Sequence, residues 1–452
     1  MNQQFANTRY PFLLGLTALC SIAMSVVATS AQEIPAAPQA SPIVLTGGTI
    51  HTVSGKTIED GEVAFENGLI SAVGKKVERP KGAKTISVIG KHVYPGMFES
   101  HSQMGLTEIA AVSATNDFQE TGTINPNVKA LVSVYPDNVI IPVTRSNGVL
   151  FALTAPTGGL ISGKSAVIQL DGWTYEDMSI KAEAAMHANW PSQYISPRRR
   201  SRMTKDEIEK AEKQQQENLR NIRDLVAQAR LYNEAKGSDD VRQKYDARLE
   251  AMIDVVEGNL PMMIRANRAA DIQSAVAFAD EQTIKIIILG GYDAEECAEL
   301  LKQHNVPVII SAVYRSPQRR DDGYDKSYTL PARLKKAGVR FCISGTDRSE
   351  TWNARTLPYH AGTAVGFGLT EEDAIKSITL YPAQILGVDD KIGSLEVGKH
   401  ASMIVTDGSP LETTTQVEMA FLAGRKVDLS NRQKRLYKKY DQRQQQLKSA
   451  GE

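Results

Sequence analysis

The stretch IKIIILGGYDAEECAELLKQHNVPVIISAVY, residues 284–314, changes its hydrophobic pattern twice. It begins with a short apolar run, continues with a helical pattern of apolar and charged residues, and ends in a second apolar run. Short apolar runs bounded by turn residues predict buried strands. A strand, a helix and a strand joined by short connections predict a parallel sheet with the helix packed on it.

The same alternation continues on both sides of this stretch. NLPMMIRA (259–266) precedes the helical pattern ADIQSAVAFADEQ (270–282), and VRFCISG (339–345) comes before TEEDAIKSITLYPAQIL (370–386). Strand and helix therefore alternate four times with short connections. In a chain of 452 residues, this favours an α/β fold with a closed barrel.

Both ends of the chain have a different pattern. Residues 43–74, IVLTGGTIHTVSGKTIEDGEVAFENGLISAVG, alternate β-branched runs with glycine and Asn-Gly turns. The same alternation of short apolar runs and turn residues returns in IGSLEVGKHASMIVTDG (392–408) and VEMAFLAGRKV (417–427). Such patterns predict short antiparallel strands.

The first 31 residues are predicted to be a targeting segment. After Arg9 comes the apolar run YPFLLGLTALCSIAMSVVA (10–28), and Thr29-Ser30-Ala31 then forms a small-x-small end. This pattern is typical of a cleaved signal peptide, which implies a periplasmic or secreted protein. An uncleaved membrane anchor is the alternative, because the run nearly reaches bilayer length.

Charge and cysteine content narrow the classes of function. Lys plus Arg and Asp plus Glu both number 52, which argues against a general nucleic-acid binder. Cys297 and Cys342 lie in apolar surroundings, so buried free thiols are expected. A long polar helix is predicted at about 204–236. The tail at 431–452 is basic and predicts a frayed helix, or contact with an anionic surface as the alternative.

Several of these segments together resemble a known family. Residues 43–74, HVYPGMFESHS (92–102), ISGTD (343–347) and the block GLTEEDAIKSITLYPAQILGVDDKIGSLEVGKHASMIV (368–405) are similar to the amidohydrolase superfamily, on its imidazolonepropionase-like side. The resemblance implies a (β/α)8 TIM barrel with a β-sandwich subdomain formed from both chain ends. The expected domains are a signal peptide (1–31), a linker (32–42), the N-terminal part of the subdomain (43–93), the barrel with its inserted helix (94–390), the C-terminal part of the subdomain (391–430) and the basic tail (431–452).

The resemblance also implies which residues carry chemistry. Family members hydrolyse C–N or C–O bonds with one or two divalent metals, which activate water and polarise the scissile carbonyl. Their ligands are a His-x-His pair ending strand 1, a His or Lys in mid-barrel, one His each ending strands 5 and 6, and an Asp ending strand 8. In this chain the matching positions hold His101 and Gln103 on strand 1, Arg265 or Asn267 on strand 5, Leu289 or Gly290 on strand 6, and Asp347 on strand 8.

Most of the expected histidines are therefore missing. Of the seven histidines, His187 is expected near the inserted region, and only His360 is a further candidate for the barrel mouth, with a scaffold role favoured. A one-metal site of His101, Asp347 and Glu99 or Gln103 is one interpretation. In the other, Arg265 replaces the metal charge and pairs with the catalytic candidate Asp347.

The segment 143–178 is expected to form mouth loops after strands 2 and 3, with Lys164 and Trp173 as mouth candidates. By family, the function is hydrolysis of C–N bonds in non-peptide or small peptide-like molecules, with a degenerate metal centre. One alternative is an inactive barrel that binds a small molecule or a partner protein, and another is a metal-free acid/base enzyme. We expect weak or absent zinc, a small-molecule ligand, no nucleic acid, no stable membrane insertion after cleavage, and homo-oligomerisation as an open option.

Overall fold

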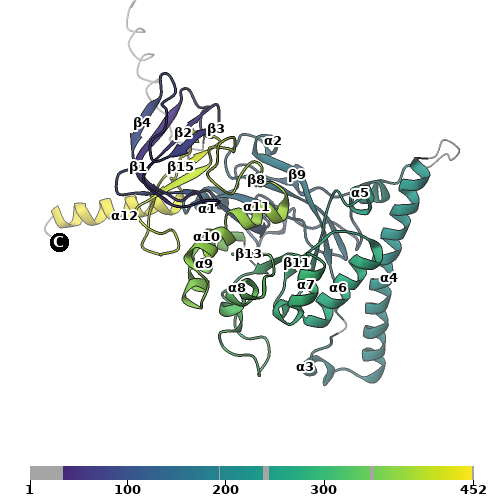
Figure 1. Cartoon of the computed structure of the whole chain (residues 1–452). Coiled ribbons are helices and arrows are strands. Elements are labelled where there is room, and N and C mark those ends of the chain that lie inside the picture. Colours follow the sequence, from purple (N-terminus) through teal and green to yellow (C-terminus); the bar gives the residue numbers. More distant parts are fainter. Residues whose placement is uncertain (1–33, 193, 238–243, 347–350, 450–452) are drawn as a thin grey trace, which may run out of the picture. The chain divides into compact units, whose positions relative to one another are not determined.

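The computed structural model describes residues 34–192, 194–237, 244–346 and 351–449. The elements below belong to one compact unit, Pro35–Glu452, shown in Figure 1. Its centre is an eight-stranded sheet that curves into a nearly closed barrel, in the order β13-β12-β11-β10-β9-β8-β7-β6. The strands are β6 (Met97–Ser102), β7 (Val149–Thr154), β8 (Ile161–Gln169), β9 (Ser179–Asn189), β10 (Met262–Ala266), β11 (Ile286–Gly290), β12 (Val308–Ser311) and β13 (Phe341–Ser344).

The two edge strands of this sheet approach each other through side chains. Ser100 Oγ on β6 donates to the carbonyl oxygen of Ile343 on β13 at 3.3 Å. Ser344 Oγ on β13 lies 3.2 Å from the carbonyl oxygen of His101. These contacts bring the carboxyl ends of β6 and β13 together, which is where the site residues of a parallel barrel lie.

One strand departs from the expected parallel pattern. β8 pairs antiparallel with both β7 and β9. The expectation of mouth loops over 143–178 is therefore wrong, because β7 and β8 are fully buried barrel strands within that segment. Their runs VLFALT and ISGKSAVIQ bury every residue, and Gly158 and Gly159 make the tight turn between them at positive φ.

The strand and helix alternation predicted for the second half of the chain is confirmed. Helices follow β10, β11 and β12, and several more follow β13. They are α6 (Ala269–Gln282), the 3-10 helix η3 (Ala294–Cys297), α7 (Ala298–Gln303), α8 (Lys326–Ala337), the 3-10 helix η4 (Thr351–Thr356), α9 (Leu357–Gly366), α10 (Glu371–Ser377) and α11 (Leu380–Leu386). The first half contributes the short helices η1 (Ser113–Thr115), η2 (Ala130–Ser133), α1 (Ile140–Arg145), α2 (Tyr175–Met178) and α3 (Pro197–Arg200).

A second eight-stranded sheet joins strands from both chain ends. Its order is β16-β15-β14-β5-β1-β2-β3, and β4 also pairs with β1. The sheet encloses a separate core that includes Phe65, Met403 and Phe421. Its strands are β1 (Ile43–Ile50), β2 (Ile58–Glu66), β3 (Leu69–Gly74), β4 (Lys84–Ser87), β5 (His92–Pro95), β14 (Met403–Thr406), β15 (Val417–Leu422) and β16 (Arg425–Lys426).

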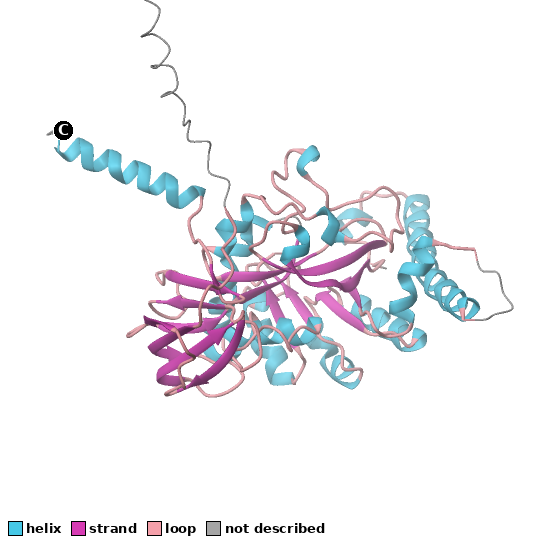
Figure 2. Cartoon of the chain, turned by 90° about the horizontal axis from the view of Figure 1, so that it is seen from above, coloured by secondary structure: helices cyan, strands magenta, loops and turns pink. Residues whose placement is uncertain are grey.

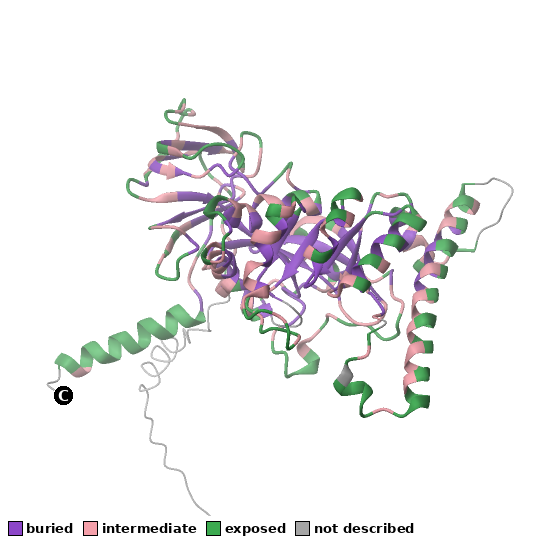
Figure 3. Cartoon of the chain, turned by 60° about the horizontal axis from the view of Figure 1, so that its bottom comes forward, coloured by how far each residue is buried: buried purple, intermediate pink, exposed green. Residues whose placement is uncertain are grey.

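The long polar helix predicted at 204–236 is confirmed as α4 (Lys205–Lys236). It begins with a capping box between Thr204 and Glu207, which satisfies backbone N–H groups at the helix start. Its buried side chains all lie in the C-terminal half, next to α5 (Ala247–Val256), whereas the first half has no buried residue (Figure 3).

The last described element is α12 (Arg432–Ser449), which has no buried residue and extends away from both sheets (Figure 2). Cys297 and Cys342 are buried free thiols, as predicted. In the part of the chain that the structure describes, no helix is both long and apolar enough to cross a membrane. The predicted signal peptide, residues 1–31, lies outside the described residues.

Candidate functional site

Two histidines meet inside the barrel, where the sequence suggested one. His101 lies on β6 and His187 on β9, and their ring centroids are 6.0 Å apart. Both side chains are buried. The expectation that His187 belongs near the inserted region is wrong, because the run AAMHANW continues the barrel strand that ends at Asn189. Its small apolar residues before Trp190 and Pro191 were the available signal for a buried strand end.

Arg265 shares the face of the sheet that carries His187. In the parallel pairing of β9 with β10, His187 lies beside Met263, and Arg265 follows two residues later. Residues two apart on a strand point to the same side. Arg265 thus lies at the end of β10, as the alignment of strand 5 predicted.

Burial and this guanidinium keep both imidazoles neutral. Burial lowers the pKa of His187, and the positive charge of Arg265 lowers it further, to about 3. The pKa of His101 lies well below its usual value through burial first, then Arg265 and His187. At neutral pH each ring therefore offers a lone pair rather than a positive charge.

Several buried polar atoms around the strand ends lack a hydrogen-bond partner among the described residues. They are His101 Nδ1, His187 Nε2, Gln103 Oε1 and Asn267 Oδ1. Buried polar groups are normally paired, so an unpaired set points to a ligand, an ion or water. Gln103 follows β6 directly, and its backbone N–H donates to Thr351 Oγ1 at 3.2 Å.

Glu99 is oriented toward β13. Its Oε1 accepts from Ser344 Oγ at 2.5 Å and from the His101 N–H at 3.2 Å, while Oε2 accepts from the Gly345 N–H at 2.9 Å. Burial raises the pKa of this carboxyl to about 7, even though these three hydrogen bonds act in the opposite direction. The carboxyl therefore holds the barrel seam between β6 and β13.

The end of β11 is filled by the side chain of Asn267. Gly290 has a φ of +107°, and a Cβ placed on it would lie 2.6 Å from Asn267 Oδ1. Leu289 and Gly290 end this strand, as predicted for strand 6. A histidine at Gly290 would collide with the amide that now occupies the space.

The other candidates lie elsewhere or outside the described residues. Asp347 falls in the segment 347–350, which the structure does not describe, so its pairing with Arg265 stays a prediction. His360 Nδ1 accepts the Val313 N–H at 3.0 Å, which is a scaffold role. Lys164 Nζ forms an ion pair with Glu183 at 2.6 Å, and Trp173 is 66% exposed.

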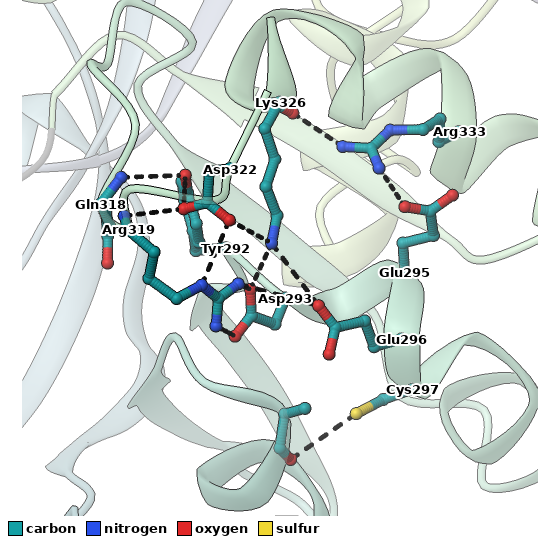
Figure 4. Close-up of polar contacts among 11 residues, drawn as sticks. Tyr292, Asp293, Glu295, Glu296, Cys297, Gln318, Arg319, Asp322, Lys326 and Arg333 are labelled. Carbon is teal, nitrogen blue, oxygen red and sulfur yellow. Dashed lines mark hydrogen bonds and ion pairs between the residues drawn. The ribbon is translucent and has the colours of Figure 1, made fainter. Parts of the chain in front are cut away.

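A network of ion pairs, which sequence reasoning missed, holds the segment after β12. The buried carboxylate of Asp293 accepts hydrogen bonds from Arg319 at 2.6 and 3.0 Å and from Lys326 Nζ at 2.8 Å (Figure 4). Arg319 Nε also donates to Asp322 at 3.1 Å. Because the Asp293 N–H donates to the Asn267 carbonyl oxygen at 2.8 Å, the network ties this segment to the end of β10. The alternating charges of RSPQRRDDGYDK (315–326) were the available signal.

The described residues do not complete a zinc site. A catalytic zinc takes three protein ligands, and no three His, Cys, Asp or Glu side chains in the described ranges are grouped to hold an ion. His101 and His187 supply two nitrogen donors, and the remaining donors are neutral amide oxygens, which zinc binds poorly. The charge of Arg265, which acts on both imidazoles, opposes a divalent cation at the same place.

Comparison with known proteins identifies the family. Residues 234–429 match the model of the Amidohydrolase family. The chain is 23% identical over 387 residues to Amidohydrolase tasK from Hapsidospora irregularis, covering 78% of this chain but only 38% of that protein. It is 22% identical over 372 residues to the imidazolonepropionase of Mesorhizobium japonicum, covering 77% of this chain and 87% of that enzyme.

The solved structure of an amidohydrolase from Thermotoga maritima MSB8 superposes with a TM-score of 0.75 at 26% identity. The match covers 85% of this chain and 99% of that one. The chain belongs to the amidohydrolase superfamily, on its imidazolonepropionase-like branch.

Proposed function

We propose that this protein is an exported amidohydrolase-superfamily member with a degenerate metal centre, whose barrel mouth binds a small molecule containing a C–N bond. The observation that carries the proposal is the position of Arg265, whose charge acts on both His101 and His187. In metal-dependent relatives the resemblance implies a histidine ligand at this strand end. A guanidinium there supplies a fixed positive charge in place of a metal.

The arrangement favours binding over turnover. An imidazole whose pKa is about 3, as for His187, is a weak general base at neutral pH, where efficient proton transfer needs a pKa near the working pH. The unpartnered atoms of His101, His187, Gln103 and Asn267 are suited to hydrogen bonds with an amide-like ligand. Asp347 remains the candidate base, and its pairing with Arg265 is part of the proposal.

A second candidate function is hydrolysis through one metal ion. It is favoured by the buried, unpartnered nitrogens of His101 and His187, to which Asp347 would add a carboxylate. When bound, a metal in this family activates water and polarises the scissile carbonyl. The two functions differ in whether the purified protein holds a metal.

Metal content after refolding with zinc tests the proposal. We expect the wild-type chain to retain well below one zinc per chain. The Arg265→His variant should take up about one, since it removes the opposing charge and adds a third ligand. Arg268→His is the matched control, because Arg268 stacks on Tyr194 instead, and it should behave as wild type. One zinc per wild-type chain would contradict the proposal and favour the metal-dependent hydrolase instead.

Two further parts of the proposal concern export and domain structure. The apolar run at 10–28 and the small residues ending at Ala31 support cleavage and a periplasmic or secreted location. The sheet with its own core around Phe65 and Phe421 supports a sandwich-like subdomain built from both chain ends. A mature N-terminus at Gln32, determined by mass spectrometry, is the expected result.

A further inference from the structure

The C-terminal helix α12 lies outside the part of the chain that matches the family. The family match ends at residue 429, and α12 runs from Arg432 to Ser449 without a buried residue. A helix of this length without packing partners is marginal in water unless it finds another surface. The helix therefore needs an explanation that the hydrolase barrel does not provide.

The start of α12 is fixed to the body of the protein. Asn431 is buried, its Oδ1 accepts the Lys434 N–H at 2.8 Å, and its Nδ2 donates to Ser146 Oγ at 2.8 Å. Ser146 directly follows α1. The helix is thus capped and anchored at its first turn, while the rest extends into solvent (Figure 2).

The exposed surface of α12 combines positive charge with apolar side chains. Leu436, Tyr437 and Tyr440 are 41%, 73% and 56% exposed. Leu436, Tyr440 and Leu447 recur at steps of four and seven residues, which places them on one stripe of the helix. Within 432–449 there are seven Lys and Arg and one acidic residue, Asp441, whereas the whole chain is balanced. The basic residues are Arg432, Lys434, Arg435, Lys438, Lys439, Arg443 and Lys448.

We infer that α12 is a peripheral anchor that lies on an anionic lipid surface. Lys and Arg are attracted to anionic headgroups, and exposed Leu and Tyr side chains can enter the interface beneath them. An acidic protein or nucleic acid would use the charges but would not need the apolar stripe. The inference is independent of whether the barrel turns over a substrate.

Vesicle binding by the full chain tests the inference. We expect binding to vesicles of phosphatidylcholine mixed with phosphatidylglycerol, and loss of this binding at high salt, since salt screens exposed charges. Vesicles of phosphatidylcholine alone measure binding that does not depend on anionic headgroups, including any contribution of the N-terminal apolar run where it is still attached. Binding to both vesicle types with equal affinity would overturn the inference.

Matched variants separate charge at α12 from net charge. Lys438→Gln/Lys439→Gln should weaken binding by roughly 25-fold, at about fivefold per basic residue near an anionic surface. Lys75→Gln/Lys76→Gln removes the same charge from an exposed turn of the second sheet and should change binding little. Equal losses in the two variants would contradict a specific role for the helix.

Variants of the apolar stripe distinguish lipid from other anionic partners. Leu436→Ser/Tyr440→Ser keeps every charge, and we expect a loss of vesicle binding of about tenfold or more, because buried apolar area contributes to interfacial binding. Since α12 has no buried residue, thermal unfolding should be unchanged. Unaltered vesicle binding, or binding to polyglutamate or DNA as tight as to the anionic vesicles, would refute a lipid anchor.

Discussion

His101 and His187 lie with their ring centroids 6.0 Å apart, tilted by 36°, although they come from β6 and β9. This proximity places two neutral imidazoles and the charge of Arg265 in one part of the barrel. The relationship matters because it gives the site a second nitrogen donor that the strand 1 motif lacks. It also means that a single substitution at Arg265 should change the pKa of both rings.

Replacing Arg265 by Met should raise the pKa of His187 from about 3 toward its usual value. The rise should be partial, since burial is the larger cause and the methionine keeps the site apolar. The measurement is an NMR titration of the imidazole protons. Arg268→Met is the control, because the guanidinium of Arg268 lies over the ring of Tyr194. An unchanged pKa of His187 in Arg265→Met would show that the charge of Arg265 has no influence on this ring.

Much of the fold could be predicted because hydrophobic periodicity is a local signal. The strands ending near Arg265, Gly290 and Ser344 and the helix at 205–236 follow directly from it. The antiparallel strand β8 could not be predicted, because its buried run ISGKSAVIQ contains Lys164, whose charge is paired with Glu183 on the neighbouring strand β9. Pairing across a sheet is a tertiary property that a single segment does not contain.

The site was predictable only where it follows a motif. The resemblance of strands 1 and 5 to the family pattern located His101, Gln103 and Arg265. His187 was missed because its segment signals a buried strand end but does not show which strand it pairs with, and the pairing of β9 with β10 is a tertiary property. The hydrogen bonds that turn Glu99 toward β13 depend on a strand far away in the chain, so its role in holding the seam also required the structure.

Replacing Glu99 by Gln should change how stability depends on pH. The folded pKa of Glu99 is raised from 4.5 to about 7, so the folded state holds a proton that the unfolded state loses between these values. This contribution is full below pH 4.5 and is lost as pH rises through 7. At 1.36 kcal/mol per pKa unit, the loss amounts to about 3 kcal/mol.

The glutamine cannot titrate, so the free energy of unfolding of Glu99→Gln should not decline between pH 4.5 and 7. A mismatched hydrogen bond should lower this free energy by about 1–3 kcal/mol at every pH. Urea unfolding at several pH values, compared with wild type, measures the difference. Glu209→Gln, at an exposed position of α4, serves as the control. If the free energy of unfolding depended on pH in the same way in wild type and in Glu99→Gln, the raised pKa of Glu99 would be contradicted.

The contact between Gly290 and Asn267 can be measured by comparing two glycines. Gly258→Ala adds a methyl at a φ of +74° with only Lys285 Cε, at 4.0 Å, nearby, so it reports backbone strain, which costs about 1–3 kcal/mol. Gly290→Ala adds one at a φ of +107° and 2.6 Å from Asn267 Oδ1. Overpacking should make it less stable than Gly258→Ala by about 1–3 kcal/mol in urea unfolding.

Adding Asn267→Ala isolates the steric part of this cost. If the amide of Asn267 fills the space at the end of β11, its removal should recover most of the extra loss in the Gly290→Ala background, and a double-mutant cycle gives the coupling energy. Strain at Gly290 would remain. Strictly additive effects of the two substitutions would mean that Asn267 moves aside without cost, and the end of β11 would then be open enough to accept a larger side chain.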